Sequence, residues 1–83
     1  MIWNLLVTKN ARKDLVRLPN REQRRIEAAL DAMEDDPFRG DIKRLEPSGW
    51  RRRVGSYRVF YDLHIEERRI VVTAISRRTS TTY

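Results

Sequence analysis

The sequence predicts an α+β fold in the order β-α-α-β-β-β, with a two-helix hairpin packed on one face of a four-stranded, mainly antiparallel sheet. Three observations lead to this prediction. An apolar run opens the chain, two segments with helical spacing follow, and alternating segments joined by very short connections fill the second half. A chain of 83 residues holds one hydrophobic core, so we expect a single domain over residues 1–83.

The first half of the chain reads as a strand and two helices. Residues 2–8 are apolar, bounded by polar residues and too short for a helix, which indicates a strand. Within residues 9–18 and 21–34, apolar residues recur at spacings of three and four, the period of one helical face. Pro19 ends the first helix and Asn20 is suited to cap the second, so we expect a helical hairpin with a very short turn.

The second half reads as three strands, at residues 50–54, 57–64 and 69–76. The intervening segments GS and IEER have the lengths of tight hairpin connections. Strands joined in this way pair with their neighbours in the chain, so they predict an antiparallel sheet with the helices on one face.

The positive charge is concentrated in the second half of the chain. The net charge is +6, but residues 1–41 contain eight basic and eight acidic residues, whereas residues 42–83 contain ten basic and four acidic ones. Such asymmetry points to a polyanion such as nucleic acid, or to an acidic protein partner. Fifteen of the eighteen basic residues are arginine, which suits bidentate phosphate recognition, although a GC-rich genome also produces arginine-rich proteins.

The composition also argues against several kinds of site and location. The chain has no cysteine and one histidine, His64, so disulfides and thiolate or histidine-rich metal sites are not expected. The N-terminus lacks the charged segment of a secretory signal, and no run approaches the ~20 apolar residues of a membrane span. We therefore expect a cytoplasmic protein with no membrane attachment, metal or other cofactor.

Alternation in the central hairpin separates an apolar face from a basic one. Arg51 and Arg53 share one side of the first arm, and Arg58 and Phe60 in the second arm point to that same side, away from the helices. Three arginines therefore converge on the outer face of the sheet. Arg52 falls on the apolar side, where we expect its stem to be covered while its guanidinium reaches the edge of the helices.

The end of the chain adds further groups to this basic region. The terminal segment SRRTSTTY carries Arg77, Arg78 and Tyr83, which we expect to complete a positive concavity that holds two or more phosphates. Phe60 and Tyr83 are candidates for stacking bases, a contact that contributes roughly 1–3 kcal/mol per base in single-strand binders. Since RNA is read mainly through splayed, stacked, single-stranded segments, this pattern favours RNA.

Specific motifs carry a resemblance to a known family over nearly the whole chain. An apolar strand and two helices are followed by PFRGDIKRL, then by WRRRVGSYRVFYD, and finally by ISRR with a late tyrosine. This pattern resembles the RelE/ParE superfamily of bacterial toxins and looks closest to its RelE branch. The resemblance implies a RelE-like fold and a toxin of a type II toxin–antitoxin system, which cleaves messenger RNA in the ribosomal A site. It also implies a cognate antitoxin, bound through an acidic, partly disordered segment.

The resemblance further implies which residues form the site. Arg51 and Arg53 match the basic residues on the strand before the Tyr-Arg motif of the family. The implied catalytic residues are Arg51, Arg53, Arg58, Arg78 and Tyr83. Together with the stacking argument, the resemblance assigns RNA binding to Lys43, Arg77 and Phe60.

The chemistry of RNA cleavage limits what these residues do. Attack by the 2′-hydroxyl needs a group that accepts a proton, groups that stabilise the added phosphoryl charge, and a group that protonates the leaving 5′-oxygen. Arginine suits only the second task, because a pKa above about 12 keeps it charged. Where many members of the family have a histidine before the final arginines, this chain has Ser76. Tyr83, made more acidic by the surrounding guanidinium groups, is then the expected base.

Two other functions stay open. A ParE-like toxin that inhibits DNA gyrase without nuclease activity shares the fold. The lack of a free lysine or histidine base in the site favours it, whereas the retained arginine and tyrosine positions favour the nuclease. The other open possibility is a non-toxic RNA-binding module or a decayed toxin. For Arg58 and Arg78, the alternative to a functional role is a surface ion pair with Asp62 or Glu66.

Overall fold

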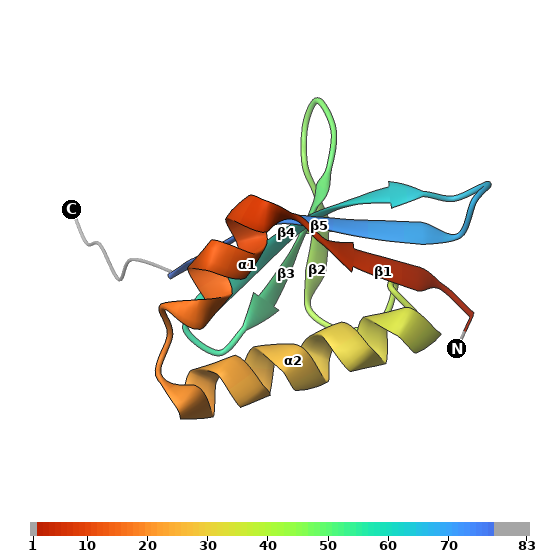
Figure 1. Cartoon of the computed structure of the whole chain (residues 1–83). Coiled ribbons are helices and arrows are strands. Elements are labelled where there is room, and N and C mark those ends of the chain that lie inside the picture. Colours follow the sequence, from red (N-terminus) through yellow and green to blue (C-terminus); the bar gives the residue numbers. More distant parts are fainter. Residues whose placement is uncertain (1, 78–83) are drawn as a thin grey trace.

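The computed structural model describes residues 2–77, which form two helices and one five-stranded sheet. In chain order the elements are β1 (Asn4–Val7), α1 (Lys9–Val16), α2 (Asn20–Asp35), β2 (Ile42–Arg44), β3 (Trp50–Val54), β4 (Tyr57–His64) and β5 (Arg69–Arg77). The order of strands across the sheet is β1-β5-β4-β3-β2 (Figure 1). Only the β1–β5 pair is parallel among these strands. The predicted α+β class is confirmed, with five strands in place of the predicted four.

The additional strand is β2, which lies at one edge of the sheet. It contains three residues, and it pairs antiparallel with β3 so that Ile42 lies opposite Arg52. Three residues are too few to show an alternating pattern, and a segment this short pairs only because β3 offers it a free edge. The sequence therefore could not reveal it.

The N-terminal helix is attached to the sheet by polar as well as apolar contacts. The Thr8 hydroxyl caps α1 by accepting a hydrogen bond from the Ala11 backbone N at 3.2 Å. The Asp14 carboxylate accepts a hydrogen bond from the Ile75 backbone N at 3.0 Å, which ties the last turn of the helix to β5. Asn20, expected to cap α2, is instead its first residue, and Pro19 occupies the cap position without a side-chain hydrogen bond.

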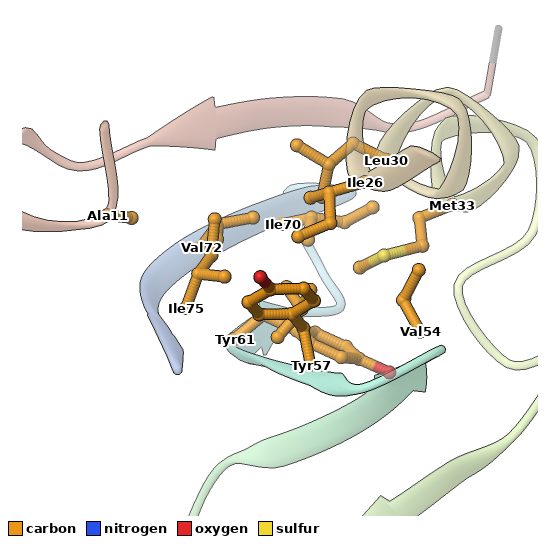
Figure 2. Close-up of a cluster of buried hydrophobic side chains, with 11 residues drawn as sticks. Ala11, Ile26, Leu30, Met33, Val54, Tyr57, Tyr61, Ile70, Val72 and Ile75 are labelled. Atoms are coloured by element: carbon orange, nitrogen blue, oxygen red, sulfur yellow. The ribbon is translucent and has the colours of Figure 1, made fainter. Parts of the chain in front are cut away.

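The core lies between the two helices and the inward face of the sheet (Figure 2). Alternate residues of β4 form its centre: Tyr57, Val59 and Tyr61 are 7%, 0% and 1% exposed. The helices contribute Ala11, Ile26, Leu30 and Met33, and the other strands contribute Val54, Ile70, Val72 and Ile75. The predicted inward face of the central hairpin is thus confirmed.

A β-bulge interrupts the alternation of β5. Tyr61 pairs with Val72 but Phe60 pairs with Ala74, so Thr73 is the extra residue on β5. The Thr73 hydroxyl donates a hydrogen bond to the Phe60 carbonyl oxygen at 3.3 Å, within this irregularity. As a result, the inward side of β5 changes from even-numbered to odd-numbered positions, and Ile75 points into the core.

Tyr61 generates a prediction about alkaline stability. Its hydroxyl donates a hydrogen bond to the Pro37 carbonyl oxygen at 3.3 Å. Burial raises the pKa of Tyr61 to about 12, although the charge of Arg52 opposes the rise. In the unfolded chain a tyrosine ionises near pH 10, so above that pH the folded state loses roughly 1.4 kcal/mol of stability per pH unit through this group alone.

We expect Tyr61→Phe to remove this loss of stability at high pH. The free energy of unfolding in urea, measured from pH 8 to about 11, should fall less steeply for Tyr61→Phe than for the wild type. Equal slopes for the two proteins would show that Tyr61 does not stay neutral in the folded state.

Candidate functional site

Four basic side chains lie on the face of the sheet opposite the helices. Residues directly opposite each other on paired strands share a face, and the register places Arg53 opposite Arg58 and Lys43 opposite Arg51. The residues that alternate with them, such as Val54, point into the core. We call Lys43, Arg51, Arg53 and Arg58 the cationic face. The predicted convergence of three arginines on this face is observed, and β2 adds a lysine to it.

The cationic face consists of two like-charged pairs side by side. The Cβ atoms of directly opposite residues lie roughly 4.5–5.5 Å apart, and like charges at that position destabilise a sheet. Arg58 and Arg53 form one pair, and Lys43 and Arg51 form the other. Neither pair stabilises the fold as a pair of opposite charges would. Folding stability therefore does not explain why these four positions carry basic residues.

Arg58 is the most constrained member of the cationic face. It lies on the central strand, between Arg53 on β3 and Ser76 on β5, and its side chain is half-buried. Its Nε atom is buried and has no hydrogen-bond partner within residues 2–77. A buried donor without a partner costs about 1–3 kcal/mol, so folding leaves the Nε donor of Arg58 unsatisfied in the part of the chain that the structure describes.

Arg53 has one weak ionic contact, with a residue that the sequence did not single out. Its Nε lies 3.7 Å from Asp41 Oδ2, and the two side chains are 40% and 57% exposed. An exposed ion pair at this distance contributes little to stability and leaves the guanidinium accessible. Aspartate after glycine is common in turns for structural reasons alone, so only the pairing of β2 with β3 reveals that Asp41 borders the site.

Phe60 places an aromatic ring beside these charges. It lies opposite Arg51 on one side and Ala74 on the other, and it is half-buried on the outer face. Two residues along a strand span roughly 6.6 Å, which is the separation between Phe60 and Arg58 along β4. A nucleotide whose phosphate contacts the arginines could therefore stack its base on this ring.

Arg77 lies on the other face of the sheet. It is exposed and opposite Tyr57, whose side chain is buried in the core. The bulge in β5 causes this placement, because uninterrupted alternation from Val72 would have turned Arg77 outward. Its RNA-binding role stays a prediction. Arg78 and Tyr83, predicted to be catalytic, lie outside the described residues.

Arg52 occupies the inward position that the alternation predicts. Its guanidinium leaves the core to one side, where Nη1 donates a hydrogen bond to the Arg39 carbonyl oxygen at 2.6 Å. The contact is therefore with the segment that follows α2, not with the helices themselves. The sequence indicated that this side chain would reach outward but not what it would bind.

The single histidine lies away from the cationic face. His64 is at the far end of β4, where its Nδ1 lies 3.9 Å from Glu67 Oε1. Within residues 2–77, no three side chains of the metal-ligating types His, Cys, Asp and Glu gather closely enough to hold an ion. In the same part of the chain, neither helix has the length and apolar character needed to cross a membrane.

Comparison with known proteins shows which family the chain resembles. Residues 5–81 match the family described as "ParE toxin of type II toxin-antitoxin system, parDE". The RelE1 protein of Methanocaldococcus jannaschii is 32% identical over 83 residues, covering 94% of this chain and 92% of that protein.

Solved structures show the same fold. The chain superimposes on the archaeal RelE–RelB complex from Pyrococcus horikoshii with a TM-score of 0.87 and 26% identity, covering 98% of this chain and 100% of that one. For the toxin–antitoxin complex RelBE2 from Mycobacterium tuberculosis the TM-score is 0.81 at 28% identity, covering 94% and 100% of the two chains. Sequence and fold agree that the chain belongs to the RelE/ParE superfamily, as a RelE-type toxin of a type II toxin–antitoxin system.

Proposed function

We propose that this toxin is a ribosome-dependent endoribonuclease that cleaves messenger RNA in the A site, and that the cationic face holds the scissile region of the RNA. The observation that supports the proposal most directly is the pair of like-charged cross-strand contacts, Arg53 with Arg58 and Lys43 with Arg51. Phosphate oxygens between the members of each pair would turn mutual repulsion into charge-assisted hydrogen bonds. A polyanion is therefore the ligand that this face fits.

The arginines account for one part of the chemistry. When the RNA 2′-oxygen attacks the neighbouring phosphorus, a bond to that oxygen forms, negative charge accumulates on the phosphoryl oxygens, and the bond to the 5′-oxygen breaks. Arg53 and Arg58 are suited to stabilise this charge, since guanidinium groups stay protonated and bind two oxygens at once. Lys43 and Arg51 would then hold an adjacent phosphate, and Phe60 would stack a base.

The proton transfers need a different group. Within the described residues, the cationic face consists of lysine and arginine side chains, and His64 lies at the far end of β4. The 2′-hydroxyl must lose a proton and the 5′-oxygen must gain one. We assign the first step to Tyr83, assisted by Arg78, and we expect no metal ion or other cofactor to take part. The 5′-oxygen takes its proton from water, and the ribosome holds the message in the geometry that the attack needs.

The proposal includes a protein partner and a location. The solved relatives include RelE–RelB and RelBE2 complexes of toxin with antitoxin. By analogy, a cognate antitoxin with an acidic segment would keep this chain inactive in the cytoplasm, where the ribosomes are. A net charge of +6 complements such a partner.

Inhibition of DNA gyrase is the second candidate function. The match to a family described as ParE toxins and the absence of a histidine from the described cationic face favour it. Gyrase inhibition needs a binding surface and no proton acceptor. A supercoiling assay with the purified protein separates the two functions, because only the nuclease leaves gyrase active and breaks messages on translating ribosomes.

The central test is replacement of Arg58. Induced expression of the wild type should arrest growth and leave breaks in translated messages. We expect Arg58→Ala to lower the cleavage rate on programmed ribosomes by on the order of 10²-fold, because it removes a donor to the developing phosphoryl charge. Arg24→Ala, which removes the same charge from the exposed surface of α2, should leave cleavage unchanged. Growth arrest with intact messages would exclude the nuclease.

A second prediction concerns anion binding without the ribosome. Tripolyphosphate at low salt should raise the melting temperature of the wild type, since a ligand that binds only the folded state stabilises it. Arg58→Met should abolish most of this rise. Without the anion, the free energy of unfolding of Arg58→Met should lie within about 1 kcal/mol of the wild-type value. The substitution removes a repulsive pair and a buried donor that has no partner among the described residues. A loss larger than about 2 kcal/mol would instead make Arg58 a structural residue.

A further inference from the structure

We infer that Arg52, although it points away from the cationic face, is a positioning residue for it: Arg52 holds the segment of residues 39–41 and thereby sets the places of Lys43 and Arg53. The effect of Lys43 and Arg53 on RNA cleavage rests on the proposed function. That Arg52 holds residues 39–41 in place does not depend on it.

The guanidinium of Arg52 is packed directly on this segment. Its Nη1 donates a hydrogen bond to the Arg39 carbonyl oxygen at 2.6 Å. A Cβ atom on Gly40 would lie 2.6 Å from Nη1 and 2.9 Å from Cζ of Arg52, so the guanidinium occupies the space where any other residue would carry its side chain. Gly40 also has a φ of 99°, which favours glycine on its own account. The close approach of the guanidinium is thus the feature that relates Gly40 to Arg52, and the φ value is a separate reason for glycine at this position.

The next residue of β3 holds the same segment from the opposite face. The Arg53 backbone N donates a hydrogen bond to the Asp41 carbonyl oxygen at 2.9 Å. The Arg53 Nε lies 3.7 Å from the Asp41 carboxylate. Consecutive residues of a strand point to opposite faces, so Arg52 and Arg53 hold three residues between them from the two sides of the sheet. Displacing this segment would move Asp41 and hence the carboxylate that contacts Arg53.

The segment also determines where β2 begins. The Ile42 backbone N donates a hydrogen bond to the Gly40 carbonyl oxygen at 3.0 Å, and Lys43 follows, opposite Arg51. β2 has three residues and pairs on one side only, so its place depends on the anchors at its two ends. At the far end, the Leu45 backbone N donates to the Gly49 carbonyl oxygen at 2.9 Å. At the near end, the Arg52 hydrogen bond is the shorter of two side-chain contacts, the other being the Arg53–Asp41 ion pair.

An aliphatic residue at position 52 could be buried against the core, but it could not hold residues 39–41 by a hydrogen bond. The inward side of β3 otherwise carries Trp50 and Val54, and a leucine between them would bury well. It could not donate to a carbonyl oxygen. A lysine could donate, but its ammonium group is not planar and would not lie flat on Gly40. The geometry therefore accounts for an arginine in a core-side position.

A double-mutant cycle tests whether Arg52 acts through Lys43. Cleavage of message on programmed ribosomes is measured for the wild type, Lys43→Ala, Arg52→Leu and the double variant. We expect each single change to lower the rate by about tenfold or more, and Lys43→Ala to have less than about a threefold further effect in the Arg52→Leu background. Arg44→Ala removes the same charge from the inward side of β2 and should leave the rate unchanged. Arg52→Lys should restore part of the activity.

Hydrogen exchange tests the structural part without any activity. The amide hydrogens of Ile42 and Arg53 both bond to the 39–41 segment, so in Arg52→Leu they should exchange at least about tenfold faster, while the amide of Val59 in the central strand should not change. If Arg52→Leu does not fold, Arg52→Met, which keeps an unbranched stem but cannot donate to the Arg39 carbonyl oxygen, should give the same selective exchange.

The outcomes separate the two proposals. Unchanged exchange at Ile42 and Arg53, or a full effect of Lys43→Ala in the Arg52→Leu background, would overturn the positioning role. Selectively faster exchange in Arg52→Leu would uphold the positioning role of Arg52 even if the wild type breaks no message. Intact messages with the wild type would overturn only the nuclease function.

Discussion

The alternation of β4 is the constraint on which the rest of the structure depends. This strand lies in the middle of the sheet, between β3 and β5, and Tyr57, Val59 and Tyr61 form the centre of the core. Because successive side chains point to opposite faces, burial of these three residues forces Arg58 and Phe60 outward. A slip of one residue would bury an arginine and expose the tyrosines. Folding itself therefore fixes where the candidate RNA-binding groups lie.

The cationic face reduces stability, and the core compensates for it. Like charges directly opposite each other destabilise a sheet, and the buried Nε of Arg58, which has no partner within residues 2–77, costs about 1–3 kcal/mol. Full burial of one large apolar side chain contributes about 1.5–3 kcal/mol, and ten of the eleven buried core residues have a side chain larger than that of alanine. The fold can therefore maintain a surface that opposes folding. Such a surface is what binding of a polyanion requires, since the ligand supplies the missing opposite charge.

The elements that sequence reasoning missed depend on contacts between distant residues. The bulge at Thr73 changes which residues of β5 face the core, and so places Arg77 on the opposite face from Arg58. No residue in VVTAIS marks a bulge, because valine, threonine and isoleucine suit either face of a strand. The partner of Arg52 is a backbone carbonyl thirteen positions away, and a carbonyl group has no signature in a sequence. Both features follow from how the strands and the segment after α2 meet.

The sequence by itself determined the fold class, the order of the predicted elements and the two faces of the central hairpin, because periodicity is a local property and burial of an apolar face is the dominant force in folding. It also determined that Arg51, Arg53 and Arg58 share the outer face. Only the tertiary structure decided that Lys43 joins them, since a strand of three residues exists through its pairing with β3. It likewise decided the contacts of Asp41 and Arg52, because hydrogen bonds and ion pairs depend on atomic distances that no pattern along the chain encodes.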